Sequence, residues 1–313
     1  MDSLVKTSGL GKSYGRLKAL QNVDLEISDA RAIGLVGKNG AGKTTLLSIL
    51  SGALKADTGN VSILGHTPRS IAGTGLLNIL PQDANFKKGI PVKKQLLLFA
   101  ELQGMNKNEA RLAVDELLNE LGDSSFVNRS ASSMSYGQRK KLGIVQAFLG
   151  KPKLVILDEP TAGLDPVAAN DVRQLIRKLS TDSAFIISSH NLYEIEDICS
   201  SVVILDQGKL VANKPISELA TTQNRLNFTL DRPAESSLLE ELQSRAGIAE
   251  VVVDRINPEK LSLDMIASEQ GEMQIEVQKL LIDKGYVIVD FSRGKALIEG
   301  IMDLVDDGQG SKN

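Results

Sequence analysis

Unbroken apolar runs in the first two thirds of the chain are followed by segments with helical patterns. The runs cover residues 32–36, 154–157 and the start of 184–190. A strand that is apolar on both faces is typical of the interior of a parallel sheet. The pattern therefore predicts an α/β fold. Helices are expected at 46–52 and within 92–121, where Leu112, Leu117, Leu118 and Leu121 are predicted to share one face.

A different pattern begins near residue 225. Alternating apolar and polar positions predict strands at 226–230, 249–253, 260–266 and 286–291, and helical patterns occupy 234–247 and 271–285. This β-α-β-β-α-β order is that of a small split βαβ sandwich. Residues 295–305 have the pattern of an amphipathic terminal helix, followed by a frayed tail. We predict an N-terminal domain at 1–220, with a helical subdomain at about 83–150, and an accessory α+β domain at 221–313.

The composition narrows the class of protein. The chain has 313 residues, 42% of them hydrophobic, and a net charge of −3, which gives no electrostatic reason to expect nucleic acid as a partner. No apolar run approaches the roughly 20 residues that span a bilayer, and the N-terminus lacks the pattern of a secretory signal. Its only cysteine, Cys199, leaves no internal disulfide framework. These features predict a cytoplasmic protein, and they are compatible with work on a membrane-embedded partner.

The strongest motif is GLVGKNGAGKTT at 34–45, which contains the spacing G-x-x-x-x-G-K-T of a P-loop. A predicted strand enters it and a predicted helix leaves it, which is the context of a true phosphate-binding loop. Glycines allow backbone N–H groups to turn toward phosphate oxygens, and the helix start adds its positive end. Lys43 would contact the outer phosphates, and Thr44 would offer a hydroxyl to Mg²⁺. The predicted nucleotide contacts here are Gly37, Lys38, Asn39, Gly40, Ala41, Gly42, Lys43, Thr44 and Thr45.

Polar residues follow the two other buried strands. Asp158 and Glu159 end the run at 154–157, and His190 ends the segment 184–190. Ligands of α/β folds bind at the carboxyl ends of parallel strands. We expect Asp158 to hold hydrated Mg²⁺, Glu159 to orient or deprotonate an attacking water, and His190 to contact the γ-phosphate. The other histidine, His66, lies in a predicted turn and is interpreted as structural.

The stretch SSMSYGQRKK at 132–141 conflicts with local helix rules. Ser135 can cap a helix that starts here, yet Arg139, Lys140 and Lys141 would then lie in the first turn, where the macrodipole disfavours cations. The basic run could be a solvated helix face, or this helix start could await an anion.

The P-loop, MSYGQ at 134–138, LVILDEP at 154–160, AGLD at 162–165 and SSH at 188–190 occur in an informative order. With them, residues 1 to about 215 resemble the nucleotide-binding subunit of an ABC transporter. The resemblance implies a P-loop NTPase core with an antiparallel β subdomain and an α-helical subdomain. The stretch at 132–141 then corresponds to the family's signature motif. In that family two subunits pack head to tail, and each signature closes over the ATP that the other holds.

The resemblance implies further roles for individual residues. Tyr14 matches the aromatic residue that stacks on adenine, Gln82 the glutamine that contacts the γ-phosphate and Mg²⁺, and Asp165 the loop acid that crosses between subunits. His190 matches the γ-phosphate histidine. Otherwise Tyr14 would be an ordinary surface tyrosine and Gln82 a loop residue. The signature residues expected at the partner's γ-phosphate are Ser135, Gly137 and Gln138.

One position departs from the family pattern. Tyr136 stands where the usual signature has its first glycine, which argues against a positive φ there and suggests that its side chain points away from the phosphate.

The form MSYGQRKKLGI resembles ATPase subunits of ABC-2 type exporters. The expected ligands are ATP and Mg²⁺, and the expected partners are a second ATPase subunit and an integral membrane permease, with the chain peripheral on the inner face of the membrane. A soluble ABC ATPase acting on ribosomes or DNA, or a nucleotide-dependent regulator, remains an alternative.

Overall fold

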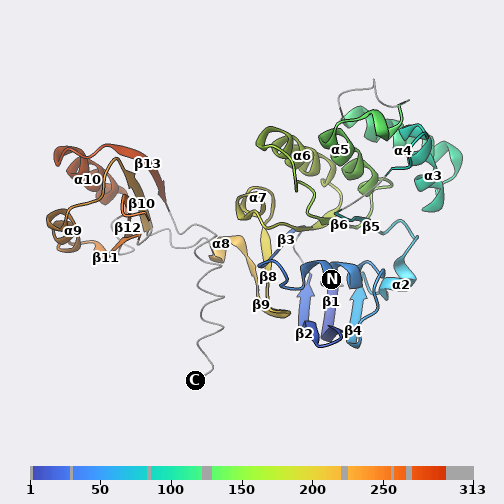
Figure 1. The fold of residues 1–313 in the computed structure, drawn as a ribbon, viewed down its shortest axis with the longest axis horizontal. Helices are drawn as coiled ribbons and strands as arrows, with labels where there is room; N and C mark the ends of the chain where they lie inside the picture. The colour runs from blue at the N-terminus through green and yellow to red at the C-terminus, as the bar shows by residue number, and fades with distance from the viewer. Residues whose placement is uncertain are drawn as a thin grey trace. The chain divides into compact units, whose positions relative to one another are not determined.

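The computed structural model describes residues 3–28, 31–82, 86–121, 129–219, 225–254, 257–265 and 270–293. The chain forms two compact units that divide between Ile216 and Ser217 (Figure 1). The predicted domain boundary at 220/221 falls at residues 220–224, outside the described residues, and stays a prediction. The predicted terminal helix at 295–305 also lies outside them.

A six-stranded sheet forms the centre of the first unit. Its order is β5-β6-β7-β3-β8-β9, with β9 antiparallel to β8 and the other neighbours parallel. The strands are β3 (Ala32–Val36), β5 (Leu77–Leu80), β6 (Leu154–Asp158), β7 (Ala184–Ser188), β8 (Ser201–Asp206) and β9 (Lys209–Pro215). The three predicted runs are β3, β6 and β7, and every residue of β6 and β7 is buried. The prediction of buried parallel strands is confirmed.

Two layers cover this sheet. On one face, α1 (Lys43–Leu50) and an antiparallel sheet share a core with the central strands; the antiparallel order is β2 (Leu17–Ile27), β1 (Val5–Tyr14), β4 (Thr58–Ile63). Helices α5 (Tyr136–Ala147), α6 (Pro166–Leu179) and α7 (Leu192–Ile198) lie over the opposite face (Figure 1). The fit on this face is close, because a Cβ at Gly34 of β3 would collide with Ile195 of α7.

The interval between β5 and β6 contains α3 (Val92–Leu102), α4 (Lys107–Glu120) and a 3-10 helix at Ala131–Ser133, followed by α5. A capping box at Asn106 and Glu109 starts α4. The predicted common face of α4 was wrong in one member: Leu112 is 72% exposed. The buried face consists of Ala110, Val114 and Leu118, at the i, i+4, i+8 spacing that places residues on one side of a helix.

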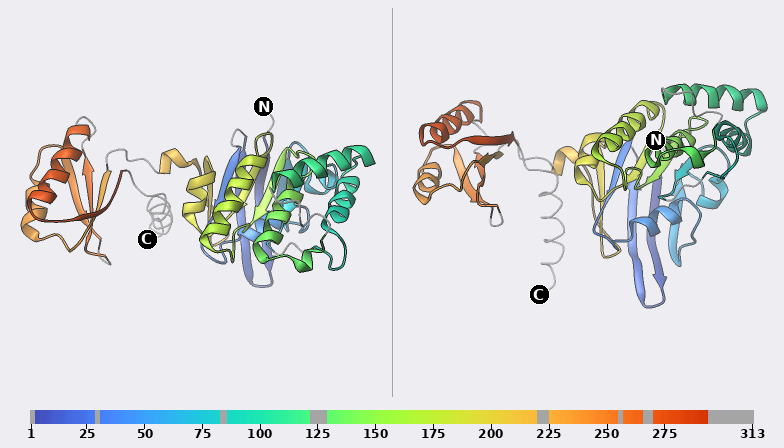
Figure 2. Two further views of the ribbon diagram at one scale, coloured as in Figure 1. Left: turned by 90° about the horizontal axis from the view of Figure 1, so that it is seen from above. Right: turned by 45° about the horizontal axis from the view of Figure 1, so that its top comes forward.

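The second unit has the predicted β-α-β-β-α-β order. Its elements are β10 (Arg225–Leu230), α9 (Ser236–Gln243), β11 (Ile248–Val253), β12 (Lys260–Met265), α10 (Gln270–Asp283) and β13 (Ile288–Arg293). The sheet is antiparallel in the order β11-β12-β10-β13, so β12 separates the two strands of the first βαβ unit. Figure 2 shows both helices, in orange to red, on one face of this sheet. Leu226, Phe228 and Leu230 point from β10 into the shared core.

Two short helices remain: α2 (Pro68–Ile71) in the first unit, and α8 (Ile216–Leu219), which begins at the division between the units. Thr67 caps α2 through its hydroxyl, which accepts a hydrogen bond from Ser70 N, and Pro68 occupies the first helical position. Among the described residues, no helix combines the length and the apolar composition that a bilayer-crossing segment needs.

The C-terminal core predicts a stability effect that is separate from nucleotide binding. Phe228 is 1% exposed, and its ring centroid lies 5.1 Å from that of Phe291. Phe228→Ala should lower the free energy of unfolding of this unit by about 3 to 5 kcal/mol, because it removes buried apolar contacts and leaves a cavity. Denaturant unfolding measures the loss. Ile275→Ala is the matched control, since Ile275 is 67% exposed. A loss below about 1 kcal/mol for Phe228→Ala would contradict this packing.

Candidate active site

The loop between β3 and α1 approaches other backbone segments too closely for side chains. Gly42, the N-cap of α1, has φ 103°, and a Cβ there would lie 2.5 Å from the carbonyl oxygen of Ala19. A Cβ at Gly37 would collide with the carbonyl oxygen of Leu205. Because a glycine caps α1 without a side-chain hydrogen bond, the N–H groups at this helix start remain available to an anion.

Lys43, the first residue of α1, extends its side chain back across the loop that precedes the helix. Its residue is 8% exposed, and its Nζ donates to the carbonyl oxygens of Gly37 at 2.6 Å and Lys38 at 3.4 Å. The ammonium group is therefore held by backbone carbonyls at the mouth of the P-loop. A phosphate is a stronger partner for an ammonium group than a neutral carbonyl, since the hydrogen bond to it is between opposite charges.

Asp158 and Glu159 lie at the carboxyl end of β6, beside the end of β7. Ser188 joins the two strands: its Oγ donates to Asp158 Oδ1 at 2.5 Å and accepts from Glu159 N at 3.0 Å. Glu159 has φ 47°, the left-handed region that non-glycine residues rarely adopt. Its Oε2 lies 2.8 Å from Nδ1 of His190. This arrangement places a carboxylate and an imidazole in contact at the same edge of the sheet.

A cavity of about 480 Å³ is lined by most of the residues predicted to contact the nucleotide that the chain itself binds. The predicted residues among those that line it are Tyr14, Asn39, Gly40, Ala41, Gly42, Lys43, Thr44, Thr45, Gln82, Glu159 and His190. Leu17, Ala19 and Ala162 complete its lining. The volume lies within the range of small-molecule sites. Tyr14 and Leu17 are 51% and 68% exposed, so one wall is an open apolar surface of the kind on which a base can stack.

The other predicted residues lie outside this lining. The carbonyl oxygens of Gly37 and Lys38 accept hydrogen bonds from Lys43, which lines the cavity. Asp158 is the last residue of β6 and directly precedes Glu159. Ser135 caps α5 in a capping box: its Oγ accepts from Gln138 N at 3.2 Å, and Gln138 Oε1 accepts from Ser135 N at 2.9 Å. Gly137 follows in the first turn. Asp165 caps α6, because its Oδ1 accepts from Val167 N and Ala168 N, both at 3.0 Å.

The basic run at the start of α5 is not a solvated face. Arg139 donates to the carbonyl oxygen of Met134 at 2.5 Å, and Lys141 pairs with Asp171 at 2.7 Å. Lys140 is buried, and its Nζ reaches two backbone carbonyl oxygens, those of Gln82 and Glu159. Each cation thus has a specific partner that compensates for its unfavourable place in the helix dipole. Tyr136 has no positive φ, as the sequence predicts, and its hydroxyl donates to the carbonyl oxygen of Ala162 at 3.1 Å.

Sequence reasoning missed a buried carboxyl group in α7 and its two hydroxyl partners. Glu194 of α7 is 1% exposed, and its Oε2 accepts from Thr161 Oγ1 at 2.8 Å and from Ser189 Oγ at 2.6 Å. Its Oε1 is buried without a hydrogen-bond partner. Burial raises the pKa of Glu194, because desolvation disfavours the charged form more than these two donors favour it. The only signal in the sequence was the position of Ser189 directly after a buried strand.

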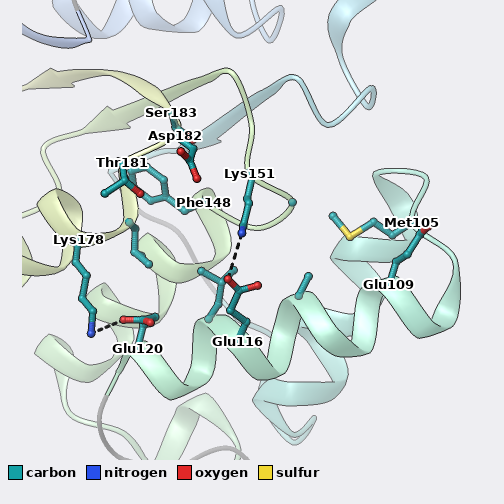
Figure 3. A pocket seen from close by; sticks show the side chains of 14 residues that line it. Met105, Glu109, Glu116, Glu120, Phe148, Lys151, Lys178, Thr181, Asp182 and Ser183 are labelled. Carbon is teal, nitrogen blue, oxygen red and sulfur yellow. Dashed lines mark ion pairs between the residues drawn. The ribbon is translucent and has the colours of Figure 1, made fainter.

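A larger cavity lies elsewhere in the same unit (Figure 3). Its volume is about 590 Å³, and it is bounded by α4 and by the segments that follow α5 and α6. Ion pairs join Lys151 to Glu116 at 3.2 Å and Lys178 to Glu120 across it. None of the predicted site residues lines it. The smaller cavity is the candidate active site, because it combines a P-loop, a strand-end carboxylate and a histidine.

Comparisons with known proteins agree with this geometry. The family model for ABC transporters matches residues 20–162. The chain is 31% identical to the uncharacterized ABC transporter ATP-binding protein YhaQ of Bacillus subtilis, over 83% of this chain and 89% of that protein. It is 29% identical to the bacitracin transport ATP-binding protein BcrA of Bacillus licheniformis, over 96% of both chains. A solved structure of an ABC transporter ATP-binding subunit matches with a TM-score of 0.62 at 27% identity, over 69% of this chain and 91% of that one.

The chain therefore belongs to the ATP-binding proteins of ABC transporters. It is an ABC ATPase that hydrolyses ATP to drive transport. The predicted fold, a P-loop core with mixed and antiparallel sheets plus a C-terminal antiparallel sheet with helices, is confirmed.

The environment of Glu194 predicts how stability depends on pH. A carboxyl group with a raised folded-state pKa contributes stability that is complete below its ordinary value of 4.5 and is lost as the pH rises through the folded-state value. Glu194→Gln keeps an oxygen acceptor for Thr161 and Ser189 but cannot ionise. Its free energy of unfolding should therefore rise relative to the unmodified protein as the pH increases from 4.5 toward 7. Urea unfolding at several pH values measures this difference.

The control is Glu196→Gln on the same helix, because Glu196 is exposed. A pH-dependent gain of equal size in both variants would show that burial of Glu194 is not its cause.

Proposed function

We propose that this chain dimerises head to tail around two Mg-ATP molecules and powers a separate transmembrane permease, with export as the direction of transport. The observation that carries the proposal is the division of the predicted phosphate contacts into two groups. Lys43, Gln82, Glu159 and His190 line one cavity, whereas the capped start of α5 does not. A helix start with an anion-binding motif but no anion-binding cavity of its own is suited to a ligand that a second chain holds.

Hydrolysis at the cavity would rest on positioning and electrostatics. The P-loop N–H groups and Lys43 would hold the phosphates, and Tyr14 would stack on the adenine. Glu159 would accept a proton from, or orient, the water that attacks the γ-phosphorus in line with the departing ADP oxygen. His190, which contacts the Glu159 carboxylate, would orient that group and donate to a γ-phosphate oxygen.

The donor set also fits Mg²⁺. Thr44 and Gln82 line the cavity, and Asp158 ends β6 one residue before Glu159 of the lining, so that one hydroxyl, one amide and one carboxylate would serve as oxygen ligands. Mg²⁺ prefers such oxygen donors and usually completes its shell with water and substrate phosphates. When bound, Mg²⁺ would neutralise phosphate charge.

Gly137 supports the role of α5 in contacting a partner's nucleotide. A Cβ added there would meet only Ala168 at 3.7 Å and Leu164 at 3.8 Å, which are ordinary contacts. Packing within the chain therefore does not require a glycine at this position. Close approach of an external group, such as a phosphate oxygen, would require one.

The permease and the direction of transport are proposed from relatives and from one surface. BcrA, which is similar over nearly the whole chain, is a bacitracin transport ATP-binding protein. Leu98 and Leu102 of α3 are 55% and 66% exposed, which gives this helix, in the interval between β5 and β6, an apolar surface for a partner. We place the chain at the membrane through that permease. Pull-down from solubilised membranes tests this partnership, and enrichment with ribosomes without any integral membrane protein would contradict it.

Glu159→Gln should allow ATP to bind but block hydrolysis, because an amide cannot accept the proton of the attacking water. The sandwich should then persist, since only hydrolysis and phosphate release remove the contacts that close it. Size-exclusion chromatography at saturating Mg-ATP should show a dimer. A monomer under these conditions would count against the head-to-tail arrangement.

Ser135→Arg should abolish turnover while leaving nucleotide binding by the single chain nearly intact, because the damage falls on the neighbour's site. Lys43→Ala should damage the chain's own site instead. Mixing these two inactive variants should restore part of the activity, since each mixed dimer contains one complete site. Loss of nucleotide binding by Ser135→Arg, or a mixture as inactive as its components, would contradict the assignment.

A further inference from the structure

Lys140 connects the signature helix to both catalytic loops of its own chain. It lies in the second turn of α5, and its residue is 8% exposed. Its Nζ donates to the carbonyl oxygen of Gln82 at 3.0 Å and approaches that of Glu159 at 3.4 Å. Gln82 and Glu159 follow β5 and β6, which are neighbours in the sheet. One ammonium group thus contacts the main chain shortly after each of two neighbouring strands.

Burial of the Lys140 ammonium group costs free energy, because it removes a charge from water. A buried ammonium group normally pairs with a carboxylate, yet Lys140 has no ion pair with any residue that the structure describes. Lys141 takes the ordinary solution, since it is partly exposed and pairs with Asp171 at 2.7 Å. The hydrogen-bond partners of Lys140 among the described residues are the two carbonyl oxygens, those of Gln82 and Glu159.

The Glu159 carbonyl is a sensitive place for such a contact. Glu159 has φ 47°, and its carbonyl oxygen also accepts from Ala162 N at 3.2 Å. A non-glycine residue keeps this conformation only where surrounding contacts hold it. Because the main-chain angles of Glu159 set the direction of its side chain, a contact at its carbonyl helps to aim the carboxylate at His190 and the cavity.

Tyr136 contacts both Lys140 and the segment that follows Glu159. Its hydroxyl donates to the carbonyl oxygen of Ala162 at 3.1 Å, and its ring centroid lies 5.7 Å from Lys140 Nζ. A Cβ at Gly163 would touch this ring at 3.4 Å. The aromatic ring in place of a glycine therefore shields the ammonium group and attaches the start of α5 to the segment after Glu159.

We propose that Lys140 is a positioning residue for ATP hydrolysis: it fixes the main chain at Gln82 and Glu159 relative to the signature helix. The inference rests on the proposed head-to-tail function. When the start of α5 closes on the partner's ATP, Lys140 transmits its position to the chain's own Glu159 and Gln82. Each active site then reaches working geometry only when its chain also engages the neighbour's nucleotide.

Lys140 does not line the cavity, so its removal should affect turnover rather than nucleotide affinity. In the full chain, Lys140→Met keeps the apolar stem but removes the donor and the charge. We expect kcat for ATP hydrolysis to fall about tenfold or more, with KM for ATP within about twofold of the unmodified value. Lys140→Arg retains donors and charge and should recover kcat to within about threefold. Lys141→Met is the matched control and should leave kcat within about twofold.

The outcomes separate the inference from the function on which it rests. In a Glu159→Gln background, Lys140→Met should still form the ATP-dependent dimer. If Glu159→Gln alone forms no dimer, the proposed function fails. If the dimer forms but Lys140→Met retains full kcat, or Lys141→Met falls equally, the role of Lys140 is overturned. Thermal unfolding and nucleotide binding report whether Lys140→Met folds; if it does not, Lys140→Gln, read by the same kcat and KM comparison, decides.

Discussion

The parallel pairing of β3, β5, β6, β7 and β8 is the constraint on which the site depends. It aligns the carboxyl ends of these strands at one edge, so that the P-loop, Gln82, Glu159 and His190 meet although they are far apart in the sequence. Backbone approaches the P-loop from both sheets: Gly37 has no room for a side chain beside Leu205 of β8, and Gly42 has none beside Ala19 of β2. The same edge carries Ser188, whose hydroxyl joins the ends of β6 and β7 and fixes the carboxylate of Asp158 and the amide of Glu159 together.

The signature helix extends this edge without sharing the cavity. Its start has two sets of contacts: the capping box at Ser135 and Gln138 orders the exposed turn, while Tyr136 and Lys140 attach the turn to the main chain behind Glu159. The proposed communication between two nucleotides therefore requires no long pathway. It requires only that α5 and the segment after β6 move as one body, which these hydrogen bonds favour.

Much of this could be predicted from the sequence, because the relevant signals are local. The P-loop spacing, the apolar strands and the acids and histidine directly after them occur within short segments, and the carboxyl-end rule places them at one edge. The cap at Ser135 was predicted for the same reason. One member of the predicted face of α4, Leu112, was wrong, because several leucines at mixed spacing allow more than one choice of face. The packing buries Ala110 and Val114 and exposes Leu112.

The sequence by itself determined the class of fold, the nucleotide-binding loop and the identity of most cavity residues, because backbone requirements and periodicity are encoded in neighbouring positions. Only the tertiary structure decided what the cations after the signature contact, why Glu194 has a raised pKa, and how Tyr136 fits in place of a glycine. Those properties depend on burial and on partners from segments that are distant in the chain. A side chain's local sequence does not reveal whether its neighbours are water, carbonyl oxygens or carboxylates.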